Sequence, residues 1–325
     1  MLPRPRFTSI RTFLSYREGS ILLVTAILSV IFALTSGNFV TSNSLSVILT
    51  IASEIGIVAA GQTMLMVVGE IDLSVGAVFA LGPYLMYSAF LMGIPLVLAF
   101  PIALLLISLV GLANGFVSVK LGVPSLITTL GMFFLVRGIT LIISNFHLIF
   151  LPTEEPFRTV VGAGVVLGAI PIPMIWTILV TFLMAVILSW TRHGLWSIAT
   201  GSNLVGAGEV GVNVVRTKIK NFVLASVLTG IAGIIQAVRI GSAEPLQGGL
   251  TRTLESVAAS VIGGTALAGG SGTIVGALIG SVLFGVLRVG LIIVGTSQVV
   301  YTLILGLAVV FSVGLNLNLV KWLKR

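Results

Sequence analysis

Two acidic residues beside long apolar segments are the first candidates for chemistry. Glu70 and Asp72 lie two positions apart in the stretch GEIDLSVG. Carboxylates at membrane depth can bind a proton or a cation, and ionisable groups placed there are functional candidates by default. Asp72 could instead cap a helix that begins at Leu73 or Ser74, because an acid is favoured at a helix N-terminus. We expect the cap, with Ser74 and Gly76 in a tight connection between helices.

Polar residues inside the apolar segments are the candidates for a translocation path. A solute that crosses a membrane needs polar groups at that depth, but the same groups also hold helices together in lipid. The path candidates are Glu54, Gln62, Thr63 and Asn114. Helix pairing is the alternative for each of them, and for Arg137 and Arg288.

The sequence contains no arrangement typical of catalysis or of a metal site. It has two histidines, His147 and His193, which lie far apart, and it has no cysteine. A thiolate ligand, a disulfide and a cysteine nucleophile are therefore excluded. We expect neither a catalytic residue nor a metal ligand.

A glycine-rich run could suggest a phosphate-binding loop. It contains Gly263, Gly264, Gly269 and Gly270, but the Gly-Lys-Ser/Thr ending of such a loop occurs nowhere in the chain. Small residues allow helices to approach closely in lipid, so we expect these glycines to serve packing. We also expect the chain to bind no cofactor directly, so any ATP must be hydrolysed by a partner subunit.

The elements that hold these residues are membrane helices. The 325 residues are 57% hydrophobic and 8% charged, with a mean hydropathy of +1.21, whereas soluble proteins carry roughly 25% charged residues. A span needs about 20 apolar residues, and the alternation typical of barrel strands is missing. The predicted fold is all-α, a polytopic transmembrane bundle of about ten spans. We place them at 20–36, 45–68, 74–92, 95–118, 125–144, 173–191, 219–239, 254–268, 273–294 and 298–317.

The segment 254–268 is short for a span and runs directly into the glycine-rich run. It could cross the membrane or form a broken, re-entrant helix. Irregular backbone at that depth is tolerated only where protein or a watery cavity covers it.

The net charge of +8 follows the topology of the chain. Most of the 17 basic residues lie in short segments beside spans. If those segments face the cytoplasm, the positive-inside rule places both termini inside. The predicted parts are a basic N-terminal tail (1–18), a transmembrane domain (19–318) and a basic C-terminal tail (319–325). This distribution indicates the lipid bilayer as the partner, and not nucleic acid.

The longest polar interruption is the 192–218 segment. It is basic and has apolar spans on both sides. A loop of this length and charge gives a cytoplasmic partner a place to hold the protein. We predict that a motor subunit docks there.

Four stretches together carry a family resemblance. They are GEIDLSVG at 69–76, VPSLITTLGMFFLVRGIT at 123–140, GLWSIATGSN…GVN at 194–213 and VIGGTALAGGSGTIVGALIGSVLFGVL at 261–287. In this order they resemble the permease of ribose-type bacterial ABC importers. The resemblance implies a multi-pass inner-membrane protein that moves a monosaccharide. Its implied partners are a second permease copy, identical or homologous, an ABC ATPase subunit and an extracytoplasmic sugar-binding protein.

The resemblance also implies which residues couple the permease to its ATPase. In that family, a short helix matching part of the 192–218 segment rests in a groove of the ATPase. Its recurring positions fall on Gly201, Asn203, Gly211, Val212 and Asn213. Family members usually carry an acid directly after the asparagine, where this chain has Leu204, and Glu209 could substitute for it.

An ion-coupled secondary transporter of a small polar solute is the alternative function. Such a transporter needs a coupling site inside the membrane, for which Glu54, Glu70 and Asp72 are the acidic candidates. A channel would need a polar filter and an enzyme a catalytic cluster, and the sequence indicates neither.

Overall fold

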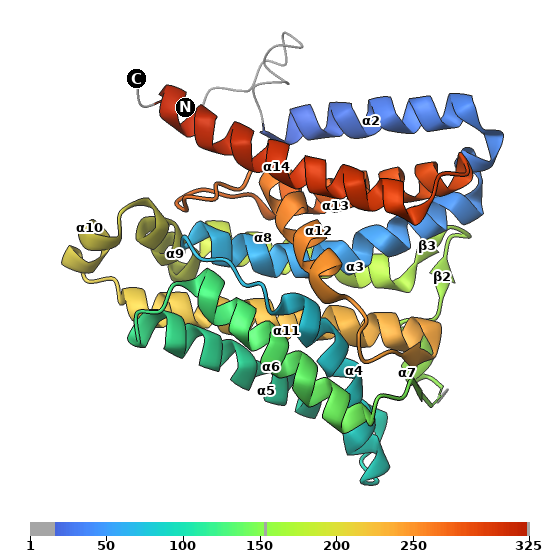
Figure 1. The fold of residues 1–325 in the computed structure, drawn as a ribbon, viewed down its shortest axis with the longest axis horizontal. Helices are drawn as coiled ribbons and strands as arrows, with labels where there is room; N and C mark the ends of the chain where they lie inside the picture. Colours follow the sequence, from blue (N-terminus) through green and yellow to red (C-terminus); the bar gives the residue numbers. More distant parts are fainter. Residues whose placement is uncertain (1–16, 153–154, 324–325) are drawn as a thin grey trace.

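The computed structural model describes residues 17–152 and 155–323, so the predicted N-terminal tail lies outside it except for Arg17 and Glu18, which open α2. Most of the long helices run roughly along the longest axis of the molecule, whereas α12 (Gly249–Ile262) crosses it at a steep angle (Figure 1). In chain order they are α2 (Arg17–Thr35), α3 (Ser42–Val67), α4 (Val75–Leu91), α5 (Leu96–Gly115), α6 (Ser125–Ser144), α8 (Ile172–Trp190), α11 (Val214–Ile240), α12 (Gly249–Ile262), α13 (Ile274–Ile293) and α14 (Gln298–Leu323).

The remaining elements are short. The helical ones are a 3₁₀ turn (Gly37–Val40), a π-helical turn (Phe116–Lys120), α7 (Phe157–Val161), α9 (Arg192–Ser202) and α10 (Leu204–Glu209). Strand β1 (Ile149–Phe150) pairs antiparallel with β4 (Ser242–Ala243), and β2 (Val165–Val166) pairs antiparallel with β3 (Ile170–Pro171). The all-α prediction therefore holds, apart from these two small ladders.

Helix α3 is the centre of the bundle. Every residue from Ala52 to Val67 is buried, because α8, α11, α12 and α13 pack around it. A helix that buries all of its faces must be surrounded by other helices. Its polar residues are therefore enclosed by protein and not by lipid.

Each of the ten predicted spans contains one helix, but the helices differ in length. In the described part of the chain, seven are long and apolar enough to cross a membrane, whereas α4 has 17 residues and α12 has 14. The prediction of a helix over 254–268 was wrong at both ends. Helix α12 begins at Gly249 and ends at Ile262, where Gly264, with φ of +95°, interrupts the helical backbone.

The bundle has two distinct ends. Helices α9 and α10 lie at the left end of Figure 1, and α7, β2 and β3 lie at the right end. Helix α11 runs from the α9 end to the α7 end, and the chain returns through β4, the loop 244–248, α12 and the loop 263–273. This passage crosses the bundle partly as loop and partly as helix, which explains why α12 is shorter than a membrane span.

Candidate functional site

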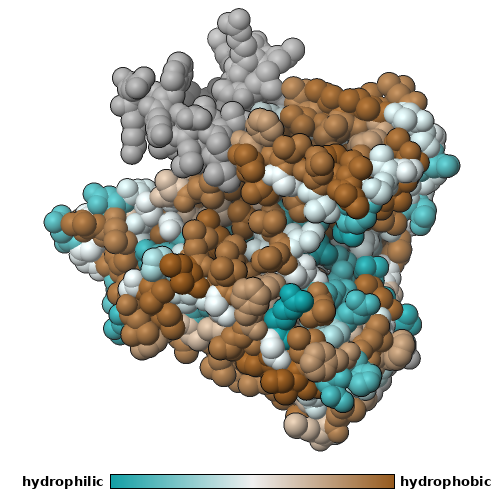
Figure 2. All heavy atoms as spheres, in the orientation of Figure 1, coloured by the Kyte–Doolittle hydropathy of each residue, from teal (hydrophilic) through white to brown (hydrophobic). Residues whose placement is uncertain are grey.

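A polar cavity of about 590 Å³ lies in the half of the bundle nearer α7. Its walls come from the first half of α3, the ends of α11 and α13, and the starts of α12 and α14. On the face shown in Figure 2, hydrophilic residues gather between the hydrophobic surface over α14 and that over α4 and α6. The lining residues are Val47, Thr50, Ile51, Glu54, Gln236, Arg239, Gln247, Gly248, Thr251, Arg252, Glu255, Arg288, Ile292 and Gln298.

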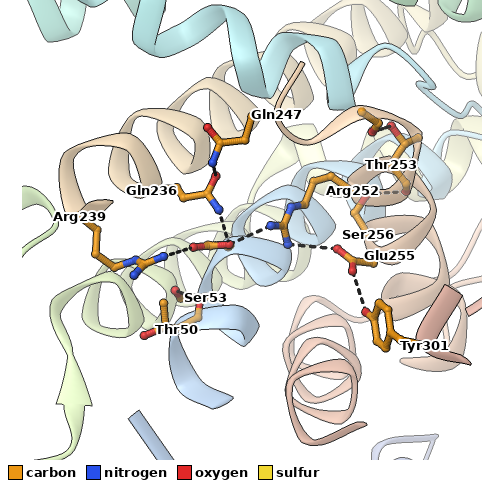
Figure 3. Close-up of polar contacts among 12 residues, drawn as sticks. Thr50, Ser53, Gln236, Arg239, Gln247, Arg252, Thr253, Glu255, Ser256 and Tyr301 are labelled. Carbon is orange, nitrogen blue, oxygen red and sulfur yellow. Dashed lines mark hydrogen bonds and ion pairs between the residues drawn. The ribbon is translucent and has the colours of Figure 1, made fainter. Parts of the chain in front are cut away.

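A chain of ion pairs and hydrogen bonds crosses this cavity (Figure 3). We call it the charge network, and its members are Glu54, Gln236, Arg239, Gln247, Arg252, Glu255 and Tyr301. Glu54 on α3 pairs with Arg239 at 3.0 Å and with Arg252 at 2.8 Å. Arg252 also pairs with Glu255 at 3.1 Å. Four helices, α3, α11, α12 and α14, are thereby joined through side chains.

Burial makes this network sensitive to loss of any one charge. The side chain of Arg252 is 7% exposed and that of Glu54 is 5% exposed. The Tyr301 hydroxyl donates to Glu255 at 2.7 Å, and the Arg252 guanidinium lies 5.2 Å from the centre of the Phe79 ring. A buried charge is tolerated when it is paired and hydrogen-bonded, as these are.

The cavity charges nearly cancel. Three arginines and two glutamates line it, and Arg288 lies over the Tyr301 ring at 5.6 Å. The ion pairs found among the described residues do not include Arg288. The amides of glutamines and the hydroxyls of threonines complete the polar lining. This lining offers many hydrogen-bonding groups with little net charge.

A second buried polar cluster surrounds Asp72, away from the cavity. The Asp72 carboxylate accepts hydrogen bonds from the Ser74 N–H at 2.7 Å and the Ser74 hydroxyl at 2.6 Å, just before α4 begins. The Asn114 amide donates to the Asp72 carboxylate at 3.1 Å, and the Gln62 amide donates to the Asp72 carbonyl. These contacts tie α3, α4 and α5 together.

The four path candidates therefore occupy different places. Glu54 lines the cavity, whereas Gln62 and Asn114 belong to the Asp72 cluster. Thr63 is buried in α3, and its hydroxyl has no hydrogen-bond partner among the described residues. The other acid of the GEIDLSVG stretch, Glu70, forms an ion pair with Lys218 at the start of α11.

The 192–218 segment contains two short helices. Asn203 precedes α10, and its side chain accepts a hydrogen bond from the Gly206 N–H at 3.0 Å. Asn213 precedes α11 and accepts from the Arg216 N–H at 2.9 Å in the same way. Both asparagines are thus helix caps, which satisfy backbone donors that the helix leaves free.

A left-handed glycine ends α10. Gly211 has φ of +86°, and its N–H donates to the Gly208 carbonyl at 3.0 Å, while the Val212 N–H donates to the Ala207 carbonyl at 3.0 Å. This pair of bonds is a Schellman motif, for which glycine is the favoured residue. Glu209 is exposed on the last turn of this helix.

The last turn of α9 contacts the glycine-rich loop after α12 through backbone atoms. We call this contact the glycine joint, formed by Val67, Gly201, Gly269 and Gly270. The Gly270 N–H donates to the Val67 carbonyl at 2.9 Å. A Cβ on Gly201 would overlap the Val67 carbonyl oxygen and lie 2.5 Å from the Gly270 nitrogen.

The other two glycines predicted to serve packing lie at the end of α12. Gly263 packs against Gly276 of α13 so closely that a Cβ would overlap the Gly276 backbone, and Gly264 takes a left-handed conformation. At the opposite end of α12, the Gly76 N–H donates to the Thr253 hydroxyl at 3.1 Å. A Cβ on Gly76 would overlap the Gly249 carbonyl. Both ends of α12 therefore rest directly on backbone.

His193 on α9 is half-buried and lies 3.3 Å from the Asn221 side-chain oxygen. Burial lowers the pKa of His193 below its usual 6.5, and nearby Lys220 lowers the pKa further, whereas the hydrogen bond to Asn221 raises it. Among the described residues, no group of three or more histidine or acidic side chains could hold a metal ion.

Sequence reasoning missed most of the charge network. Of its members, only Glu54 was a path candidate. Arg252 and Glu255 are three positions apart in an otherwise uncharged segment, which places them on one helix face. That spacing was a usable signal, but Gln236, Gln247 and Tyr301 meet the pair only through the fold.

The comparisons with known proteins find permeases of similar sequence. A family model described as "Branched-chain amino acid transport system / permease component" matches residues 44–313. The xylose/arabinose import permease of Sulfolobus acidocaldarius is 38% identical over 300 residues, which cover 90% of this chain and 83% of that protein.

Two further relatives come from Escherichia coli. Its ribose import permease is 34% identical over 300 residues, which cover 91% of this chain and 92% of that protein. Its D-allose transport system permease is 29% identical over 301 residues, which cover 92% and 91%. No solved structure matches the chain.

Proposed function

This chain belongs to the family of ABC importer permease components, multi-pass proteins of the inner membrane, and we propose that it carries a monosaccharide through the polar cavity. The relatives are import permeases for xylose/arabinose, ribose and allose. In this family ATP is used by a partner ATPase, and a substrate-binding protein is the other partner.

The lining of the cavity carries this proposal. Ligand pockets typically measure about 300–1,000 Å³, and this one measures about 590 Å³. A neutral sugar needs hydrogen-bonding groups and not a counter-charge. The arginines and glutamates pair mainly with one another, so the cavity suits a neutral polyhydroxyl solute better than an ion.

The position of the cavity supports delivery from the α7 end. Its lining comes from the half of the bundle opposite α9 and α10. We place the sugar-binding protein at the α7 end and the cytoplasm at the α9 end. This orientation puts the basic 192–218 segment inside, as the positive-inside rule requires, and with ten crossings both termini are cytoplasmic.

The 192–218 segment is our proposed docking site for the ATPase. It projects from the α9 end of the bundle (Figure 1) and exposes apolar side chains, with Val205 69% and Val210 79% exposed. Solvated apolar residues rimmed by polar ones are typical of interaction sites. Asn203, Gly211 and Asn213 shape the segment as caps, and Glu209 is available for an ion pair.

Two variants test the docking. Gly211→Val places a β-branched residue at a left-handed position, and Asn203→Arg removes the cap of α10 and adds a charge. Neither position lies in a span, so both proteins should insert and fold. We expect each to lose ATPase co-purification and sugar-stimulated ATP hydrolysis. Parent-like values for both variants would show that the segment is only a connector.

Membrane sidedness has its own test. Single cysteines at Leu167, between β2 and β3, and at Val205, on α10, should react with an impermeant thiol reagent from opposite sides. The chain has no cysteine of its own, so the background is low. Labelling of both from outside would contradict the proposed orientation.

The ion-coupled alternative is tested in vesicles that hold this protein alone. We expect no sugar uptake when a proton or sodium gradient is imposed. Glu70 and Glu54, two of the acidic candidates for such coupling, are already paired with basic side chains. Uptake driven by either gradient would overturn the importer assignment.

A further inference from the structure

We propose that α12 transmits conformational changes of the ATPase-docking segment (192–218) to the sugar cavity, with Gly201, Gly269 and Gly270 as its positioning residues. This inference rests on the proposed function. It adds a defined route between two sites that lie at opposite ends of the bundle.

The first step of the route is the glycine joint. Gly201 belongs to the last turn of α9, inside the docking segment, and its carbonyl and Cα lie about 3 Å from where a Cβ on Gly269 would stand. The Ser202 hydroxyl donates to the Gly270 carbonyl at 3.5 Å. Any movement of the end of α9 is therefore applied directly to the loop that follows α12.

The second step is α12 itself. Its first two turns hold Arg252 and Glu255 in the wall of the cavity, and its last residues lead into the loop of the glycine joint. Glycines with positive φ stand at both ends: Gly248 directly before the helix, Gly249 as its first residue and Gly264 after it. Such residues can absorb large backbone rotations, so the helix can move as one body between them.

Backbone contact makes this route stiff. Flexible side chains can change rotamer and absorb a small displacement, but a glycine contact has no side chain that could do so. Gly280 packs on the Ala259 carbonyl, and Gly76 packs on the Gly249 carbonyl, so α12 is seated on backbone along its length as well. Packed interfaces of this kind switch between arrangements and do not deform gradually.

The last step is the charge network. Arg252 moves with α12, whereas its partner Glu54 is fixed in the buried core of α3. A shift of α12 separates the two or changes their angle, and thereby changes the shape of the cavity. ATP binding by the partner subunit would in this way open or close the cavity floor.

A cysteine reporter tests the route in the assembled transporter. Thr251 is exposed in the cavity wall on α12, and Thr251→Cys supplies the only thiol of the chain. In the complex with the ATPase, we expect the rate of modification by a small charged thiol reagent to change several-fold when a non-hydrolysable ATP analogue is added. We expect Gly269→Ala, which forces the glycine joint apart from outside the docking segment, to abolish that change while the ATPase still co-purifies.

Two further variants make the outcome decisive. Gly131→Ala on α6 has no atom within 4 Å of the added methyl, so it should respond to nucleotide like the parent. Ser202→Ala removes a joint hydrogen bond and adds no atom, so it should reduce the response even if Gly269→Ala fails to insert. A nucleotide-independent rate in the parent complex, or a parent-like response of both joint variants, would overturn the inference. Loss of the ATPase from the parent would instead contradict the proposed function.

Discussion

The charge network and the glycine joint are held together in opposite ways. The network joins four helices through long side chains that reach into a cavity, and its contacts depend on charge. The joint brings backbones together with no side chain between them, and its contact depends on volume. The difference indicates that contacts around α12 can be adaptable at the cavity, where the solute passes, and stiff at the glycine joint, where movement of the docking segment is applied.

The largest effect should follow removal of the central charge of the network. Arg252→Ala leaves Glu54 and Glu255 buried without their shared partner, and breaking a buried pair in this way costs about 3–5 kcal/mol. Thermal unfolding of the purified protein in detergent measures it. Arg239→Ala is the matched control, because that side chain is 32% exposed and its loss should cost less. Equal losses would show that burial does not govern the network.

A smaller effect is expected from Tyr301→Phe, which deletes one hydroxyl and leaves the ring under Arg288. A hydrogen bond to a charged group contributes about 1.5–3 kcal/mol. The same thermal unfolding should show a loss in this range. In a Glu255→Gln background the partner of the hydroxyl is neutral, so Tyr301→Phe should then cost less stability than it does in the parent. If the stability losses of the two single variants simply add up in the double variant, direct pairing of Tyr301 with Glu255 is contradicted.

Two alanine variants test whether a glycine in close backbone contact tolerates an added methyl group less well than a glycine without such a contact. Gly76→Ala places a methyl on the Gly249 carbonyl, and overpacking of this kind costs about 1–3 kcal/mol. Gly138→Ala on α6 meets no atom within 4 Å, so it should gain up to about 1 kcal/mol from helix propensity. Opposite signs in thermal unfolding are expected, and a loss at both positions would show that contact does not distinguish them.

The smallest effect concerns pH. The pKa of His193 is below 6.5 in the folded protein, so the unfolded state binds more protons as the pH falls through 6.5. Folding stability from this residue is therefore present above that pH and is lost below it. The protection factors for amide exchange in α9, which are corrected for the intrinsic pH dependence of exchange, should be lower at pH 5.5 than at pH 7.5. His193→Gln should remove that difference, and a difference that persists would assign it to another group.

The sequence predicts the positions and order of the long helices better than their lengths. Long apolar runs identify α3, α5, α8 and α13, because a span in lipid must be apolar over its whole length. Helix α12 begins at Gly249, five residues before the predicted start at position 254, and therefore includes the buried Arg252. Only the fold reveals that Glu54, from a distant helix, neutralises this arginine.

The candidate site was predictable only where its residues carry local sequence signals. The glycine of the Schellman motif and the capping asparagines carry local signals, since turns and caps need particular residues. The charge network carries almost none, because Gln236 and Tyr301 are 65 positions apart and each is ordinary in its own helix. Contacts between distant segments are set by packing, which a single sequence does not reveal.

The short helix α12 also bears on how the protein enters the membrane. A lone arginine or aspartate at the centre of an inserting helix costs about 2.5–3.5 kcal/mol, and α12 carries Arg252 and Glu255 within only 14 residues. It cannot partition into lipid on its own hydrophobicity. Glu54 is synthesised nearly 200 residues earlier, so α3 is already available when α12 leaves the ribosome. The protein itself, and not the bilayer, is the solvent into which this segment inserts.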